Sequence, residues 1–361
     1  MFRLLNLAIA LIAVLGSVSA SAETLVISSW GGAYEESQRR AYAEPFIAKN
    51  PGLEIIWEAK SNDALANLRA QVEANNITWD LVDLLPDAAQ IACDEGMLEP
   101  INHNTQLAQG DDGSLPTDDF FAGALGDCFV ATIIYSNVVA FNTEIFTGAQ
   151  PKTMIDVFDT KNFPGKRAFE KTPLSLMEWA LIADGVPLAK VYATLETRKG
   201  VQRALRKLDT IKDSIVWWEV GAQAPQLLAD KEVAFASAYN GRIFNAQVNE
   251  KQPFQIIWDA QVLEFDGWGI PKGKASSQVL EFLKFSTDSQ RLADQAKYIS
   301  YGPARKSSAL LVSTHADTGV DMQPHMPTAP VNVANALPKD IEFWTDNLDE
   351  LRQVFNAWLN R

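Results

Sequence analysis

Short apolar runs alternate with amphipathic segments along the N-terminal part of the chain. The runs at 25–27, 53–57 and 79–85 have the length and character of buried strands. The segments at 34–48 and 64–74 lie between them and have the spacing of helices. Short strands that alternate with helices indicate βαβ units and a mostly parallel sheet.

A longer apolar run at 129–141 is rich in β-branched residues and exceeds the length of an ordinary strand. We interpret it as a strand that crosses between two domains. A second alternating region follows this run. The elements expected there are helices near 195–211, 226–229 and 339–358 and strands near 216–218, 233–235, 254–258 and 262–270.

These patterns predict an α/β fold with two lobes, each a mixed, mostly parallel sheet flanked by helices. Lobe 1 is expected to comprise residues 23–135 plus 264–312, and lobe 2 residues 136–263 plus 313–361. In such folds a ligand binds between the lobes, at the carboxyl ends of the strands.

The N-terminus has the order of features of a signal peptide. Arg3 is the only charged residue among residues 1–22, an apolar run occupies 4–15, and the segment ends in Ala-Ser-Ala. The run is shorter than a membrane-spanning helix requires. We predict cleavage after Ala22 and a periplasmic mature protein. An uncleaved anchor is the alternative, whereas a lipoprotein would need a cysteine at the cleavage point.

Composition and charge narrow the range of partners. The formal net charge of −14 at pH 7 opposes binding to phosphate backbones, and no basic patch offsets it, so we expect no nucleic-acid partner. Cys93 and Cys128 are the only cysteines. An even count in an exported chain favours a disulfide between them, with two buried thiols as the alternative.

Motifs for catalysis are absent from the sequence. His103, His315 and His325 are scattered and lack zinc-site spacing. No nucleophile elbow, Walker loop or dinucleotide fingerprint occurs. Asp111 and Asp112 lie in a glycine-rich loop, where solvation explains them better than calcium does. We therefore expect a protein that is not an enzyme and that has no metal and no cofactor.

Five short motifs follow one another in a characteristic order. They are Trp-Gly-Gly-Ala-Tyr at 30–34, Trp-Asp-Leu-Val at 79–82, Asp-Glu-Gly-Met-Leu at 94–98, Tyr-Asn-Gly at 239–241 and Asp-Gly-Trp-Gly-Ile-Pro at 266–271. Over nearly the whole mature chain they resemble the periplasmic spermidine/putrescine-binding proteins, within the extracellular solute-binding proteins of ABC importers. The resemblance implies a type II periplasmic-binding-protein clamshell that closes over a small-molecule amine. It also implies docking onto an ABC permease and its ATPase at the inner membrane, and we expect a monomer.

Residue by residue, the resemblance implies that Asp266 holds a ligand ammonium and that Tyr239 and Tyr301 supply aromatic contacts. Other positions depart from the polyamine-binding pattern. They are Glu264 in place of a tryptophan, Thr172 and Ser175 in place of an acidic pair, and Leu85 and Asp87 in place of a serine and a tyrosine. These departures concern the choice of ligand and leave the fold untouched.

Side-chain chemistry points to the same region. Asp266 could form charge-assisted hydrogen bonds to an ammonium, or it could cap the turn before Gly267. Asp83 and Asp87 could add to the negative field, or they could cap the helix at Ala88. The rings that could surround a cation, with core packing as their alternative, are Trp30, Trp218, Tyr239 and Trp268.

Arg242 follows Asn240 and Gly241 and points to a different ligand. A guanidinium repels a dication, whereas it binds a carboxylate through two parallel hydrogen bonds. The pair Arg242 and Asp266 would suit a zwitterionic ω-amino acid such as γ-aminobutyrate, unless Arg242 is a surface residue. The leading interpretation is a polyamine-class binding protein for import. The alternatives are an ω-amino-acid binder and, on the same fold, an exported enzyme or a receptor-linked sensor.

Overall fold

The computed structural model describes residues 23–361. Its first half contains three parallel strands, with β1 (Glu23–Ser28) between β2 (Leu53–Glu58) and β3 (Leu81–Leu84). All four residues of β3 are buried, because helices cover both faces of the sheet there. The helices of this half are α1 (Gly32–Gln38), a π-helical turn (Arg39–Ala43), α2 (Glu44–Lys49), α3 (Ala64–Glu73), α4 (Pro86–Asp94), α5 (His103–Gln106) and α6 (Pro116–Asp119).

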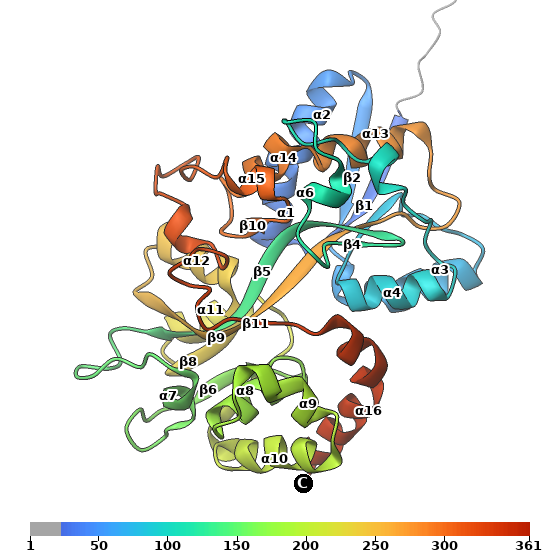
Figure 1. Cartoon of the computed structure of the whole chain (residues 1–361). Coiled ribbons are helices and arrows are strands. Elements are labelled where there is room, and N and C mark those ends of the chain that lie inside the picture. The colour runs from blue at the N-terminus through green and yellow to red at the C-terminus, as the bar shows by residue number, and fades with distance from the viewer. Residues whose placement is uncertain (1–22) are drawn as a thin grey trace, which may run out of the picture.

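Two long antiparallel strands, β5 (Phe129–Asn142) and β9 (Phe254–Gly269), connect the two halves of the molecule (Figure 1). They make one continuous sheet with the order β2-β1-β3-β9-β5-β8-β6-β7. Short strands flank the long pair: β4 (Leu125–Gly126) and β10 (Gly302–Pro303) pair with β5, and β11 (Leu337–Pro338) pairs with β9.

The second half repeats the parallel arrangement. Strand β6 (Arg167–Glu170) lies between β7 (Ile215–Trp218) and β8 (Phe235–Tyr239), and β8 runs antiparallel to β5. The helices of this half are α7 (Met154–Phe158), α8 (Leu176–Ala183), α9 (Val191–Leu195), α10 (Arg198–Asp209), α11 (Gln223–Ala229) and α12 (Asn240–Val248).

The C-terminal part of the chain returns to both halves. Helices α13 (Ser277–Ser286), α14 (Ser289–Gln295) and α15 (Lys306–Ala309) lie with the first half in Figure 1. The last helix, α16 (Ile341–Leu359), follows β11 and buries its apolar stripe in the core of the second half. Each half therefore has its own apolar core, which is what a two-lobed α/β fold requires. The residue boundaries given above for the two lobes stay a prediction.

Most of the elements expected from the sequence are present, and three differ. The strands expected at 254–258 and 262–270 are one strand, β9, with a bulge at which Ala260 has φ 58°. The helix expected at 195–211 begins at Arg198, since Thr197 caps it by accepting from the Gly200 amide. Strand β8 begins at Phe235 and not at Val233.

Cys93 on α4 and Cys128 before β5 form a disulfide, as the even cysteine count predicts. The predicted signal peptide, residues 1–22, lies outside the described residues. Between residues 23 and 361, no helix combines the length and the apolar character needed to cross a membrane.

Candidate ligand-binding site

A buried carboxyl group lies where the two halves meet. Asp266 is on β9, and its two oxygens accept hydrogen bonds from Trp30 Nε1 and from the Tyr34 hydroxyl, both at 2.7 Å. Trp30 follows β1 and Tyr34 is on α1, so these donors come from more than two hundred residues earlier in the chain. Gly31 makes the connection between them, with φ 68°, a backbone conformation that favours glycine. The arrangement orients the carboxyl group rigidly.

A second carboxyl group, Asp83 on β3, lies beside the first. Gln38 Nε2 donates to both of its oxygens at 3.0 Å, and the Tyr34 hydroxyl lies 3.3 Å from Oδ1. Burial and the charge of Asp266 raise the pKa of Asp83 well above its usual range. Burial raises the pKa of Asp266 to about 8, although the hydrogen bonds from Tyr34 and Trp30 oppose this. At neutral pH the pair therefore holds a proton that an incoming cation can replace.

Four tyrosine rings form a cluster that includes Tyr34, the partner of the two carboxyl groups. The ring of Tyr301 lies 5.9 Å from that of Tyr34 and 6.0 Å from that of Tyr135, and the rings of Tyr135 and Tyr239 lie 5.7 Å apart. Gly241 permits this packing, because a Cβ there would approach the Tyr301 ring to 2.5 Å. Such faces and edges suit a short methylene chain with a cationic end.

Tyr34 and Tyr135 were not among the residues expected from sequence at this site. Tyr34 ends the motif at 30–34, and Tyr135 lies within the long apolar strand. The sequence offered one indication for each residue: Tyr34 belongs to a motif, and Tyr135 belongs to the crossing strand. The sequence did not indicate which face of each element turns toward the other half.

Arg242 reaches across the junction from the first turn of α12. Its Nη1 lies 3.2 Å from the point that a Cβ on Gly32 would occupy, and its Nε lies 3.0 Å from the equivalent point on Gly221. Within residues 23–361, Arg242 forms no salt bridge. A half-buried guanidinium without a carboxylate partner is suited to an anionic group of a ligand.

Tyr239 brings a further acid to the site. Its hydroxyl lies 3.3 Å from Oε1 of Glu170 at the end of β6, and its ring meets the edge of Trp218 at 5.9 Å. Burial raises the pKa of Glu170 to about 7, although the hydrogen bond from Tyr239 opposes this. Trp218 is buried in the second half and donates to Ser237 Oγ at 3.2 Å, so it supports Tyr239 from behind. Glu170 was missed because it belongs to no motif.

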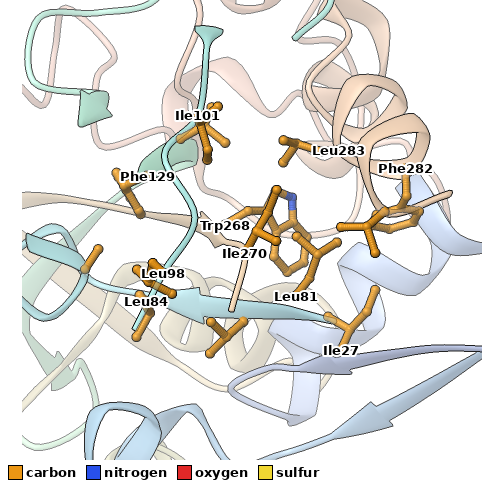
Figure 2. Packing of buried hydrophobic residues seen from close by; sticks show 14 of the residues in the cluster. Ile27, Leu81, Leu84, Leu98, Ile101, Phe129, Trp268, Ile270, Phe282 and Leu283 are labelled. Carbon is orange, nitrogen blue, oxygen red and sulfur yellow. The ribbon is translucent and has the colours of Figure 1, made fainter. Parts of the chain in front are cut away.

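Trp268, which the sequence predicts beside the ligand, lies in the core of the first half, and its contact with a ligand stays a prediction. Its ring is fully buried and packs against the ring of Tyr42. It also packs against the ring of Phe282, as Figure 2 shows. Asp266 and Trp268 lie on the same face of β9 because side chains repeat every two residues along a strand. The two side chains differ in their partners: Asp266 bonds to Trp30 and Tyr34, whereas Trp268 packs against Tyr42 and Phe282.

A cavity of about 190 Å³ lies beside the disulfide, away from these residues. Its walls are mainly apolar and include Pro86, Phe129 and Ile341, with Asp127 as the one charged residue among them. None of the predicted ligand contacts lines it. We define the candidate site by the converging Asp83, Asp266, Arg242 and tyrosines, since these groups have the charges that an amine or amino-acid ligand requires.

Comparison with known proteins identifies the family. The family model described as bacterial extracellular solute-binding protein matches residues 41–328. The chain belongs to this family. It is 35% identical over 347 residues to the gamma-aminobutyric acid-binding protein of Pseudomonas aeruginosa, covering 96% of this chain and 93% of that protein.

Two solved structures are also similar at 31% identity, each covering 93% of this chain. The periplasmic binding protein MotA of A. tumefaciens B6, in complex with glucopine, has a TM-score of 0.80 over 99% of its chain. The Atu4243 GABA receptor has a TM-score of 0.77 over 98% of its chain. The expected type II periplasmic-binding-protein fold is confirmed.

The family assignment confirms part of the functional prediction. This solute-binding protein serves an ABC transporter; members of the family bind a small molecule, work with a permease and an ATPase, and are not enzymes. The polyamine class, which was the leading interpretation, is not supported. Two of the similar proteins are named for γ-aminobutyrate, which agrees better with the ω-amino-acid alternative.

Proposed function

We propose that this protein binds γ-aminobutyrate, or a closely related ω-amino acid, and presents it to an ABC permease and its ATPase. The protein would act in the periplasm as a monomer after removal of residues 1–22. The observation that carries the proposal is the charge arrangement of the junction. The junction brings together two buried acids, Asp266 and Asp83, and Arg242, which has no carboxylate partner within residues 23–361.

Each group of the ligand has a partner in this arrangement. The ligand ammonium would replace the shared proton of the acid pair and bond to the free lone pairs of Asp266. The methylene chain would lie among Tyr239, Tyr301 and Trp30. The carboxylate would pair with Arg242, which a polyamine could not do because its second cation would be repelled. The name of the Pseudomonas aeruginosa relative supports the same ligand.

Calorimetric titration tests the proposal. Wild-type protein should bind γ-aminobutyrate more tightly than putrescine, spermidine or glucopine. Asp266→Asn and Arg242→Met should each weaken γ-aminobutyrate by about a hundredfold or more, since breaking one partner of a buried charged contact costs about 3–5 kcal/mol. The matched controls are Asp349→Asn and Arg352→Met on the exposed face of α16, which should bind as wild type does.

The contrary result is equally clear. If wild-type protein prefers putrescine, and Arg242→Met leaves that affinity unchanged or improves it, the ligand is a polyamine and the proposal is wrong.

A further inference from the structure

A buried cation lies beside the candidate site without being part of it. Lys339 follows β11, and its ammonium contacts Asp87 Oδ2 at 3.1 Å and also Glu264 Oε1. All three side chains are buried, at most 9% exposed. They come from three connected elements: α4 of the first half, the crossing strand β9, and the segment that leads into α16.

This Lys339 triad is continuous with the tyrosine cluster. The second oxygen of Glu264 accepts a hydrogen bond from the Tyr135 hydroxyl at 2.7 Å. The ring of Tyr135 packs against those of Tyr239 and Tyr301. Glu264 is therefore one contact away from the rings that would surround the ligand chain.

Glu264 and Asp266 also share one face of β9. Residues two apart along a strand project to the same side, about 7 Å apart. The negative charge of Glu264 contributes to the raised pKa of Asp266, after the larger effect of burial. Lys339 neutralises Glu264. Without this cation, Glu264 and Asp266 would be two acidic positions at a spacing that suits the two ammonium groups of a short diamine.

Lys339 supplies such a cation from within the chain. Burial alone would lower the pKa of Lys339, but Asp87 and Glu264 raise it overall, so the ammonium stays charged. A buried ion pair is weak evidence for a role in stability, because apolar side chains of similar volume can often replace it at no cost. We propose that Lys339 occupies the position of a second ligand ammonium, and thereby excludes diamines and selects ligands with a single cation.

This inference rests on the proposed function, because it explains why an acidic junction would accept an ω-amino acid and reject a diamine. The test is calorimetric titration of Lys339→Met with putrescine and γ-aminobutyrate. The putrescine affinity should rise by about tenfold or more relative to wild type, since Glu264 becomes free to pair with the second ammonium. The affinity for γ-aminobutyrate should not rise.

A double variant separates selectivity from a general structural effect. Lys339→Met combined with Glu264→Gln should lose the gain in putrescine affinity, because the freed carboxylate is removed while a hydrogen-bond acceptor for Tyr135 remains. An unchanged putrescine affinity in Lys339→Met, or an equal loss for both ligands, would overturn the inference. A gain that persists in the double variant would overturn it too.

Glu264→Gln alone provides the test if Lys339→Met does not fold. Lys339 then keeps only Asp87 as a partner, and its excess positive charge should weaken putrescine at least about tenfold more than the zwitterion. Equal losses would contradict the inference. The proposed function is tested separately: it is wrong if wild-type protein does not bind γ-aminobutyrate. In that case the putrescine affinities of the variants still show whether Lys339 excludes a second ammonium.

Discussion

At the scale of single residues, Asp266 is subject to two opposing effects. Trp30 and Tyr34 donate to its oxygens and favour the carboxylate, while burial favours the neutral acid. Burial is the larger effect, so the pKa is about 8. The charge of Asp266, and with it the binding of an ammonium, therefore depends on pH.

We expect ligand affinity to depend on pH through Asp266. An ammonium requires the carboxylate, so below the pKa of about 8 binding must release a proton. Affinity for γ-aminobutyrate should then rise between pH 6 and pH 8 by up to about tenfold per unit, and level off above that. Titrations in two buffers of different ionisation enthalpy should detect the released proton. Constant affinity across this range would contradict the raised pKa.

At the scale of elements, the contact between β5 and β9 controls the connection of the two halves. At Gly267 a Cβ would approach the backbone oxygen of Val130 to 2.1 Å and Ala131 Cα to 2.5 Å. Only glycine permits this approach, which lies next to the register shift between Ala131 and Ile133. Asp266, the neighbour of Gly267, depends on that register for its position.

Gly267→Ala should therefore destabilise the protein by about 3 kcal/mol, because backbone cannot move aside as a side chain can. Urea unfolding measures the loss. Gly269→Ala is the matched control on the same strand: its Cβ would meet only the methyl ends of Leu84 and Leu98 at 3.2–3.3 Å, and should cost about 1 kcal/mol. Equal losses for the two variants would show that the close strand contact is not responsible.

The disulfide is a second feature that connects elements of the fold. It ties α4 to the start of β5 across a sequence separation of 35 residues. The variant Cys93→Ser with Cys128→Ser should lose roughly 3–4 kcal/mol of unfolding free energy, since closing such a loop restricts the unfolded chain. Urea unfolding of the variant, compared with oxidised and reduced wild-type protein, measures this. A midpoint equal to that of the oxidised protein would disprove the contribution.

At the scale of the whole molecule, the candidate site draws on both halves. Asp83 and Tyr34 are on elements of the first half, and Asp266 is on the crossing strand β9. Tyr239, Arg242 and Glu170 are on elements of the second half. A ligand that bonds to both sets holds the halves together. Separation of the halves would break the site, because neither half contains both the acid pair and the guanidinium.

γ-Aminobutyrate should therefore compact the molecule by a hinge motion about the crossing strands β5 and β9. Small-angle scattering should give a smaller radius of gyration with saturating ligand than without it. Asp266→Asn, at the same ligand concentration, should stay at the value of the free protein. A radius that does not change with ligand in the wild type would indicate a rigid junction.

Local patterns determined much of this protein. Alternating apolar and helical segments established the α/β class, the long run at 129–141 identified the crossing strand β5, and Cys93 and Cys128 implied their disulfide. Asp266 and Arg242 could be selected because charge chemistry belongs to the residue itself. These features depend on period, composition or side-chain type, all of which the chain carries locally.

The tertiary structure alone decided which of these residues meet. The period of a strand assigns Glu264, Asp266 and Trp268 to one face of β9. Only the tertiary packing gives them different surroundings: Glu264 joins the Lys339 triad, Asp266 faces the site, and Trp268 lies in the core. Tyr34 reaches Asp266 across 232 residues, and Lys339 reaches Glu264 across 75. Contacts between residues so far apart in the sequence depend on how the two halves pack against each other. A local sequence pattern contains no information about which distant residues meet.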